Sequence, residues 1–301
     1  MGRYVRRVLD DWRDESDLDV ALIVRKKADA VELTRDFPYA VRTNARGRFD
    51  AVWYPWNAMR FDVPGARSVV LLHDAFAFTF PHRQWIARRR EQLPIRRALS
   101  RADALAANSA WTASEFARLF GIDAASFTVV HPVPDPWWQP VEPQRRPPFV
   151  LVVSGPEERK NLPTLQAAFA RAFGANGCEL LVVGNVPGTA LRPGDGDLRE
   201  LYSGALAVAV PSSAEGYGLA AVEAMACGAP VIASDATALP EACDGAALLV
   251  SPFDVEAWAG ALRSVVDDAS LRATLRERSL ARVARIDRRE PARLILSLLR
   301  R

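Results

Sequence analysis

The feature that most constrains this chain is a strand–loop–helix–strand unit within residues 204–234. Residues 205–210 form a short apolar run that stops at a proline, which is typical of a strand buried on both faces. Residues 219–227 are rich in helix formers, and a glycine and a proline then end that helix. Residues 231–233 read as the next strand. We therefore expect the loop at 211–218 to lie at the carboxyl edge of a parallel sheet, where such folds bind ligands.

Two carboxylates flank this loop, Glu215 and Glu223, with seven residues between them. The backbone N–H groups at the start of the helix form an anion site that needs no side chain. We expect that site to use Gly216, Tyr217, Gly218 and Leu219. Carboxylates that accept hydroxyl hydrogen bonds beside a phosphate cradle suit a sugar nucleotide. The simpler alternative makes Glu223 a solvated helix residue and Glu215 a helix cap.

The motif Glu-Gly-Tyr-Gly-Leu, followed by Glu-Ala-Met-Ala-Cys-Gly-Ala-Pro-Val-Ile-Ala-Ser, resembles the E-x7-E signature of the GT4-type retaining glycosyltransferases (glycosyl transferases group 1). About a dozen positions carry this likeness. The resemblance implies an α/β fold of GT-B architecture, with two Rossmann-like, doubly wound domains that face a cleft.

The order of strands and helices supports two such domains. Apolar strand patterns alternate with helical ones before residue 132 and again from residue 149, and seven prolines fall between 132 and 148. We expect strands at 19–24, 50–54, 68–72, 102–108, 127–131, 149–153, 179–183 and 246–250, and helices at 4–13, 84–101, 111–120, 161–174, 197–203, 254–267 and through 270–301. The predicted domains are an acceptor-side domain at 1–132, a proline-rich linker at 133–148, a sugar-nucleotide-binding domain at 149–285 and a helix at 286–301 that crosses back toward the first domain.

A basic segment follows the first strand of the second domain. Gly155 allows close approach of a ligand to the backbone, and Arg159 and Lys160 bring two positive charges to a helix N-terminus. A departing nucleoside diphosphate needs such neutralisation. The segment can also be a solvated basic turn. Its Arg-Lys-Asn sequence, which ends at Asn161, resembles the corresponding segment of the GT4 family and favours the donor site.

His73 and Asp74 follow the predicted strand at 68–72. A lone histidine is more often structural than functional. Here the pair resembles the His-Asp of the family, in which the imidazole or its backbone contacts the transferred sugar. On this resemblance Asp74 serves the acceptor side.

The resemblance implies transfer with retention at the anomeric carbon, by front-face attack as the diphosphate leaves. Glu215 then holds sugar hydroxyls, Glu223 the ribose, and Arg159 with Lys160 the pyrophosphate. No cofactor and no metal are expected, because the nucleoside-diphosphate sugar is a co-substrate. The Asp195-Gly196-Asp197 sequence looks like a metal-binding Asp-x-Asp motif, but we interpret it as a turn and an N-cap.

The resemblance has two departures. The family begins with a strand and a Gly-rich loop ahead of the helix that here starts near Met1, so we expect that a misassigned start removes them. Residues 185–197 form a proline- and glycine-rich loop where the family has a helix and another strand. We expect this to remove a central strand, at the cost of unpaired backbone groups, and to weaken recognition of the base.

Composition limits the partners and the compartment. A net charge of +3 is too small to indicate nucleic acid binding. Three scattered cysteines suggest reduced thiols in a cytoplasm, and we find neither a membrane-spanning run nor a signal-peptide core. Residues 83–101 carry seven arginines and one glutamate among apolar residues, a pattern that fits either peripheral contact with the inner face of a membrane or an ordinary exposed helix.

The sequence therefore predicts a hexosyltransferase that moves a mannose-, glucose- or rhamnose-like sugar to a glycan or lipid-linked saccharide in cell-surface polysaccharide synthesis. One alternative is a catalytically inactive GT-B remnant that binds glycan or nucleotide. Another, a phosphorylase-like enzyme, is disfavoured. Such enzymes use a pyridoxal-phosphate lysine, and Lys160 is the last of three lysines.

Overall fold

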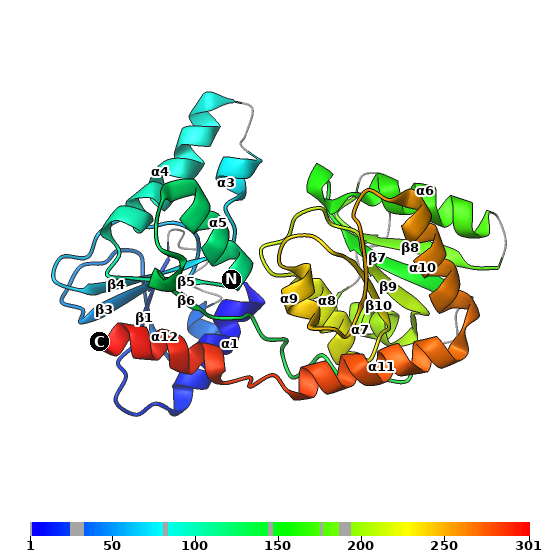
Figure 1. The fold of residues 1–301 in the computed structure, drawn as a ribbon. Helices are drawn as coiled ribbons and strands as arrows, with labels where there is room; N and C mark the ends of the chain where they lie inside the picture. Colours follow the sequence, from blue (N-terminus) through cyan, green and yellow to red (C-terminus); the bar gives the residue numbers. More distant parts are fainter. Residues whose placement is uncertain (1, 25–32, 81–83, 144–146, 175–176, 187–193) are drawn as a thin grey trace. The chain divides into compact units, whose positions relative to one another are not determined.

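A computed structural model of the 301-residue chain describes all residues except 1, 25–32, 81–83, 144–146, 175–176 and 187–193 (Figure 1). The chain forms two compact units. Unit 1 comprises Met1–Asn108, Thr112–His131 and Arg288–Arg301, and unit 2 comprises Ser109–Trp111 and Pro132–Asp287. Residue 83 of the predicted basic segment and residues 144–146 of the predicted linker lie outside the described residues.

Unit 1 is built on parallel strands with helices on both faces of its main sheet (Figure 1). Its strands are β1 (Ala21–Ile23), β2 (Ala40–Arg42), β3 (Ala51–Tyr54), β4 (Arg67–Leu72), β5 (Ala104–Ala107) and β6 (Phe127–Val129), and its helices are α1 (Arg3–Asp11), α3 (Phe76–Thr79), α4 (Trp85–Arg101), α5 (Ala110–Phe120) and α12 (Glu290–Arg300). Short 3-10 turns occur at Trp12–Asp14 and Ala124–Ser126.

The central strand β4 shows why helices cover both faces. It is an unbroken apolar run, and successive side chains of a strand point to opposite faces. Val69 and Leu71 pack in one buried cluster with α1 and α12, whereas Val70 and Leu72 pack in another with α4 and α5. The C-terminal helix is held in unit 1 by polar contacts as well. The indole Nε1 of Trp12 donates to the carbonyl of Ala292 at 3.1 Å.

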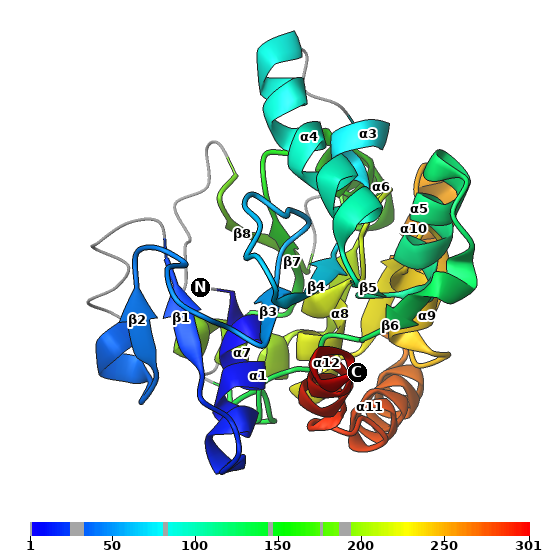
Figure 2. The same cartoon turned by 90° about the vertical axis from the view of Figure 1, so that its left-hand side faces the viewer.

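The strands of unit 1 fall into two ladders. Strands β3, β4, β5 and β6 form a four-stranded parallel sheet in that order, and β1 pairs in parallel with β2 alone (Figure 2). The apolar side chains of β1 and β2 nevertheless pack in the same cluster as α1, β4 and α12. Both ladders therefore share one core, although no ladder joins β1 to β3 among the described residues.

Unit 2 has a five-stranded parallel sheet in the order β11-β10-β9-β7-β8. Its strands are β7 (Phe149–Ser154), β8 (Glu179–Gly184), β9 (Ala207–Val210), β10 (Val231–Ser234) and β11 (Leu248–Val250), and its helices are α6 (Leu162–Phe173), α7 (Asp195–Gly204), α8 (Leu219–Ala226), α9 (Leu239–Cys243), α10 (Val255–Asp267) and α11 (Ala269–Ala284). A 3-10 turn at Glu158–Lys160 precedes α6.

Alternating residues of the two central strands serve the two faces of this sheet. Val150 and Val152 of β7 join the cluster formed with α6 and α10, and Leu151 joins the cluster formed with α7 and α8. In β9, small alanines face α6 and α10 while Val208 and Val210 face α7 and α8. The predicted α/β class with doubly wound parallel sheets is confirmed.

The tail at 270–301 is helical, as expected, and consists of two helices, because α11 ends at Ala284 and α12 begins at Glu290, next to a proline that suits a helix start. One expectation about the sheets is wrong. The sheet of unit 2 has not lost a central strand. Strand β7 pairs with β9 on one side and with β8 on the other, so β8 is the edge strand of this sheet among the described residues.

Candidate functional site

The candidate donor site lies where the strand order of unit 2 reverses. From β7 the chain passes through α6 to β8 on one side, whereas β9, β10 and β11 follow one another on the other side (Figure 1). Strands β7 and β9 are direct neighbours, so the loops after them meet at the carboxyl edge of the sheet. Open α/β sheets bind ligands at such a switch point. The two predicted motifs occupy these two loops.

The charged side chains of the two loops converge on Glu215. The ammonium Nζ of Lys160 donates to Oε1 of Glu215 at 2.7 Å, and the guanidinium of Arg159 lies 3.6 Å from Oε2 of the same carboxylate. All three side chains are mostly shielded from water. The Arg159 guanidinium also donates to the carbonyl of Ala214 at 3.2 Å. The structure thus brings together three of the predicted catalytic residues, and both cations already face a negative charge.

Backbone contacts hold the two loops together. The amide of Ser213 donates to the carbonyl of Arg159 at 2.8 Å, which links the loop after β9 to the loop after β7. The amide of Glu215 donates to the hydroxyl of Thr237 at 2.9 Å. Thr237 has a left-handed backbone, with φ of 55°, in the turn after β10. Sequence reasoning missed Thr237, although its position just after a third parallel strand would have indicated it.

Helix α8 starts at this site. Its N-cap is Gly218, whose φ of 108° is a conformation that side chains rarely adopt. A Cβ at Gly218 would also lie 2.6 Å from Cδ2 of Leu239, so this position requires glycine. Gly216 lies in the same turn, and Leu219 begins the helix. The start of a helix leaves backbone N–H groups without intrahelical acceptors, which suits it to an anion.

Tyr217 is a core residue. It is 4% exposed and packs in the buried cluster on the α7 and α8 face. Burial raises its pKa to about 12, and the Arg282 side chain hydrogen-bonds to it. The phenol of Tyr217 therefore anchors the loop in the core. A contact between this residue and a sugar nucleotide would be made by its backbone.

Glu223 is buried in the middle of α8, with 4% of its surface exposed. A buried carboxylate is tolerated only with polar partners. The alternative in which Glu223 is a solvated helix residue is wrong, and Glu215 is not the N-cap of α8, because Gly218 is. The two carboxylates thus have different surroundings. Glu215 lies beside the two cations, and Glu223 is buried in the helix that follows the loop.

Asn161 orders the loop after β7. It is 6% exposed, adopts a left-handed backbone with φ of 50°, and caps the start of α6. Its side-chain amide donates to the carbonyls of Pro211 and Pro252, and its oxygen accepts from the hydroxyl of Thr164 at 2.7 Å. Every polar atom of this side chain is used within unit 2. At Gly155 the atoms nearest to an added Cβ belong to the carboxylate of Glu157, the end of a movable side chain.

His73 and Asp74 lie in unit 1, directly after β4. Nε2 of His73 lies 2.7 Å from the carbonyl of Pro55, which can only accept, so Nε2 carries the proton. The pKa of this imidazole is lowered, mainly because the ring is buried. The ring packs against the half-exposed indole of Trp56, with centroids 4.8 Å apart. His73 is therefore a neutral, oriented imidazole at neutral pH.

Asn57 organises this loop and was missed by sequence reasoning. Its side-chain oxygen accepts from the amide of His73, and its NH₂ donates to the carbonyl of Asp74 at 3.0 Å. Oδ1 of Asp74 accepts from the amide of Phe76 at 3.0 Å, at the start of α3. Asp74 thus has a local structural role in addition to the acceptor role expected for it.

The Asp-Gly-Asp sequence lies inside a helix. Helix α7 begins at Asp195, its N-cap is Gly194, and Oδ2 of Asp197 accepts from the Gly194 amide at 3.3 Å. The expectation that this sequence precedes the helix as a turn is wrong, because the first turn of α7 includes it. Within the described part of the chain, no group of three or more His, Cys, Asp and Glu side chains is arranged to hold a metal ion. Residues 187–193 of the shortened loop lie outside the described residues.

Two protein-family models match this sequence. The family model described as Glycosyltransferase Family 4 matches residues 11–137, and the one described as Glycosyl transferases group 1 matches residues 141–282. The O-antigen chain mannosyltransferase B of Escherichia coli is 41% identical over 87 residues, which are 29% of this chain and 23% of that protein. A D-inositol 3-phosphate glycosyltransferase of Actinosynnema mirum is 39% identical over 129 residues, 42% of this chain and 29% of that protein. The matches span less than a third of the length of these relatives.

Solved structures share the fold over almost the whole chain. Anabaena Alr3699/HepE in complex with UDP and glucose aligns with a TM-score of 0.75 and 17% identity, covering 99% of this chain and 96% of that one. WaaG, a glycosyltransferase involved in lipopolysaccharide biosynthesis, aligns with a TM-score of 0.72 and 15% identity, covering 98% and 95%. At such identities the likeness concerns the fold alone, and it confirms the predicted GT-B architecture. Because the two family models together match nearly all of the sequence, the chain belongs to the GT4-type glycosyltransferases.

Proposed function

We propose that this chain is a retaining hexosyltransferase that takes a mannose-, glucose- or rhamnose-like sugar from a nucleoside diphosphate. The observation that carries the proposal is the convergence of Arg159, Lys160 and Glu215 at the switch point of unit 2, beside the start of α8. Cations and helix N–H groups suit a diphosphate, and a carboxylate within reach of them suits sugar hydroxyls.

The proposed reaction replaces one bond at the anomeric carbon. The bond to the diphosphate oxygen breaks, the acceptor hydroxyl forms a bond on the same face, and the leaving diphosphate accepts the proton of that hydroxyl. Arg159 and Lys160 stabilise the charge that develops on the leaving group. Lys160 uses one of its three N–H donors on Glu215, so two remain for phosphate oxygens. In this proposal the protein supplies positive charge without a metal.

The remaining residues have supporting roles in the proposal. Glu223 binds the ribose, Glu215 binds sugar hydroxyls, and the backbone of Gly216, Gly218 and Leu219 approaches the donor. Asn161 supports the donor loop through its protein contacts. In unit 1, His73 contacts the transferred sugar and Asp74 serves the acceptor. We place the reaction in cell-surface polysaccharide synthesis at the cytoplasmic face of a membrane, with a glycan or lipid-linked saccharide as acceptor.

Titration calorimetry of the whole chain against UDP, GDP and TDP tests the donor site. One nucleoside diphosphate should bind. Lys160→Met should weaken it about 10- to 100-fold, the loss expected for a charge-assisted hydrogen bond. Glu223→Ala should weaken the nucleoside as well as the nucleotide. Arg171→Gln removes an exposed charge on α6 that pairs with Glu256, and it should leave affinity unchanged.

Turnover separates the enzyme from the inactive remnant. A binding chain that releases nucleoside diphosphate in the presence of saccharide acceptors, with product that keeps the donor's anomeric configuration by NMR, supports the proposal. Activity that survives EDTA supports the metal-independent mechanism. Binding without turnover across donors and acceptors favours the remnant. The absence of binding to all three nucleotides contradicts the donor site itself.

A further inference from the structure

One exposed surface of unit 1 combines arginines with large apolar side chains. It is formed by the end of α3 and the first half of α4, and we call it the α4 tip: Phe80, Trp85, Ile86, Arg88, Arg89, Arg90 and Leu93. The four apolar members are each at least half exposed, at 53%, 66%, 50% and 52% in that order. We propose that the α4 tip docks on a bilayer that contains anionic lipid headgroups, an interaction that deepens the membrane-face location in the proposed function and uses none of its donor-site residues.

The helix period places these residues on one side of α4. Trp85, Arg89 and Leu93 are spaced at i, i+4 and i+8, and Ile86 and Arg90 form the neighbouring row, so the five side chains occupy one continuous face. This face is exposed to solvent although three of its five residues are large and apolar. Solvent exposure of Trp85 and Leu93 costs free energy that a water-soluble helix ordinarily avoids.

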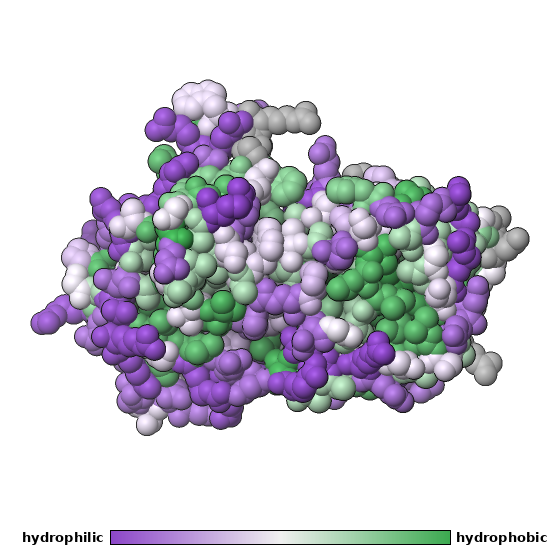
Figure 3. All heavy atoms as spheres, in the orientation of Figure 1, coloured by the Kyte–Doolittle hydropathy of each residue, from purple (hydrophilic) through white to green (hydrophobic). Residues whose placement is uncertain are grey.

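The other half of α4 is anchored in unit 1. Ile95 and Ala98 are buried in the cluster with β4 and α5. Gln92 donates to the carbonyl of Ala77 at 2.7 Å, which ties α4 to α3. The anchored half therefore projects the α4 tip from a fixed base. Figure 3 shows the hydrophilic and pale side chains gathered over this projection of α3 and α4.

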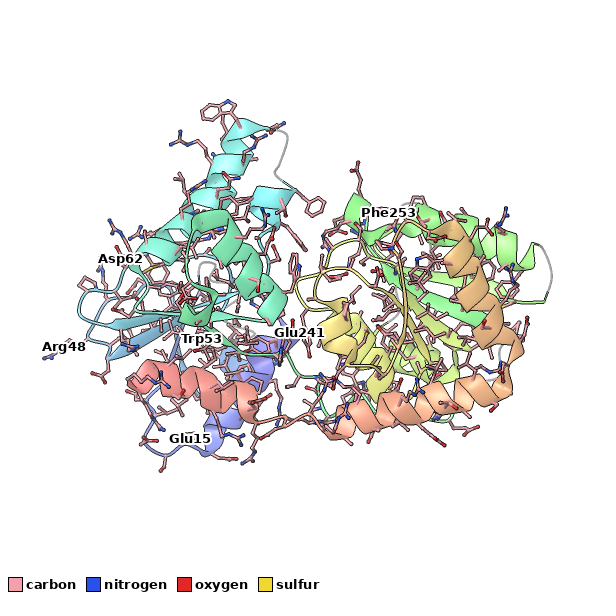
Figure 4. All side chains as sticks on the ribbon, viewed as in Figure 1. Glu15, Arg48, Trp53, Asp62, Glu241 and Phe253 are labelled. Carbon is pink, nitrogen blue, oxygen red and sulfur yellow. The ribbon has the colours of Figure 1, made fainter. Side chains whose placement is uncertain are left out.

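The arginines at the base and at the tip differ in their contacts. Arg97 and Arg101 pair with Asp62, near the base of α4 (Figure 4), and Arg96 lies over the rings of Phe78 and Phe120. Arg89 and Arg90 are exposed at the tip, where Glu91 is the single acidic residue of α4. The tip consequently presents concentrated positive charge beside its apolar side chains.

A bilayer interface satisfies both parts of this surface. Indole rings settle at the headgroup level, aliphatic side chains enter the acyl boundary, and arginines bind anionic headgroups while their stems lie along apolar surface. Nucleic acid would satisfy the arginines, but it offers nothing apolar for Ile86 and Leu93. No helix among the described residues is long and apolar enough to cross a membrane.

Co-sedimentation of the whole chain with vesicles tests the proposal. Vesicles of phosphatidylcholine with about one-third phosphatidylglycerol should bind the chain, and pure phosphatidylcholine should bind it far less. Arg89→Gln with Arg90→Gln should lower the partition coefficient by about 25-fold, at about fivefold per arginine. Trp85→Ser with Leu93→Ser should lower it by at least tenfold at unchanged charge.

The matched control is Arg46→Gln with Arg48→Gln. These arginines are exposed in the turn before β3, and Arg48 points outward on the side of unit 1 away from the α4 tip (Figure 4). This variant has the same net charge as the tip variant and should keep wild-type binding. Circular dichroism and nucleotide titration verify that each variant is folded and that its donor site is unchanged.

Three results would overturn the proposal. The first is an equal loss of vesicle binding in the tip and control variants, which indicates nonspecific charge attraction. The second is equal binding to both kinds of vesicle, and the third is no binding to either. If the tip variants instead lose a protein partner while vesicle binding is unchanged, the surface is a protein interface. Because the donor titration reports on unit 2, a failed membrane proposal is distinguishable from a failed proposed function.

Discussion

Asn161 gives the sharpest stability prediction, because its side chain is fully used within unit 2. Replacement by alanine removes the two donations to the carbonyls of Pro211 and Pro252 and the acceptor for Thr164, and it leaves a Cβ-bearing residue in a left-handed conformation. Replacement by glycine removes the same hydrogen bonds but adopts that conformation without strain. The pair of variants therefore separates the two contributions.

The magnitude follows from the structure. Each of the three lost hydrogen bonds costs about 0.5–1.5 kcal/mol. The left-handed backbone costs alanine about 1–2 kcal/mol. We expect Asn161→Ala to lower the free energy of unfolding by about 3–5 kcal/mol. Asn161→Gly should be less destabilised by about 1 kcal/mol, because the greater freedom of unfolded glycine offsets part of its advantage.

Urea denaturation followed by fluorescence and circular dichroism measures both variants. Gln166→Ala, which truncates an exposed amide on α6, is the control and should change stability by no more than about 0.5 kcal/mol. Nucleotide affinity is measured on the same samples below the unfolding transition. A wild-type urea midpoint in Asn161→Ala, together with a large loss of nucleotide affinity, would refute the reasoning and make Asn161 a direct ligand contact.

Three further predictions concern the donor loop, the imidazole and the thiols. Gly218→Ala should destabilise unit 2 by about 1–3 kcal/mol and weaken nucleotide binding, because the added Cβ meets Leu239 and the backbone is left-handed. The control Gly196→Ala has open space around the added Cβ and should stabilise the chain by up to about 1 kcal/mol. Thermal melts and nucleotide titrations of both variants check this. The pKa of His73 is lowered below 6.5, so the unfolded chain binds its proton more readily; its contribution to stability is present above pH 6.5 and is lost as pH falls through the folded-state pKa. Urea titrations between pH 5 and 8 should show a shallower pH dependence in His73→Gln, and an unchanged slope contradicts the prediction. Burial raises the pKa of Cys243 to about 12, so Ellman's reagent should modify the partly exposed Cys178 first and Cys243 only on unfolding, as mass spectrometry of early product would show.

Much of the architecture was predictable from local patterns. Apolar runs such as 67–72 and 149–154, separated by helical periods, are sufficient to indicate parallel strands with helical crossovers, and most predicted boundaries agree with the structure within about two residues. The short elements were missed. Strand β2 at Ala40–Arg42 and helix α9 at Leu239–Cys243 are too brief to show a period, and they form because neighbouring elements pack against them.

The donor motifs were recognisable for a related reason. Glu215, Gly218 and Glu223 lie within one loop and one helix, so their spacing alone places them around a helix start. The proximity of the Lys160 ammonium to Glu215 is a tertiary property. Fifty-five residues separate the two, and only the adjacency of β7 and β9 brings their loops together.

The sequence by itself determined the fold class, the order of the elements and the two short motifs, because hydrophobic period, glycine and proline act locally. Only the tertiary structure decided which side chains pack or hydrogen-bond within the protein and which are left to contact a ligand. It buried Tyr217 in the core, used the amide of Asn161 to join two loops, and assigned Asn57 and Thr237 to hold backbone in place. The physical reason is that burial and hydrogen-bond partners depend on strands and loops far apart in the chain, whose order in the sheet no local pattern specifies.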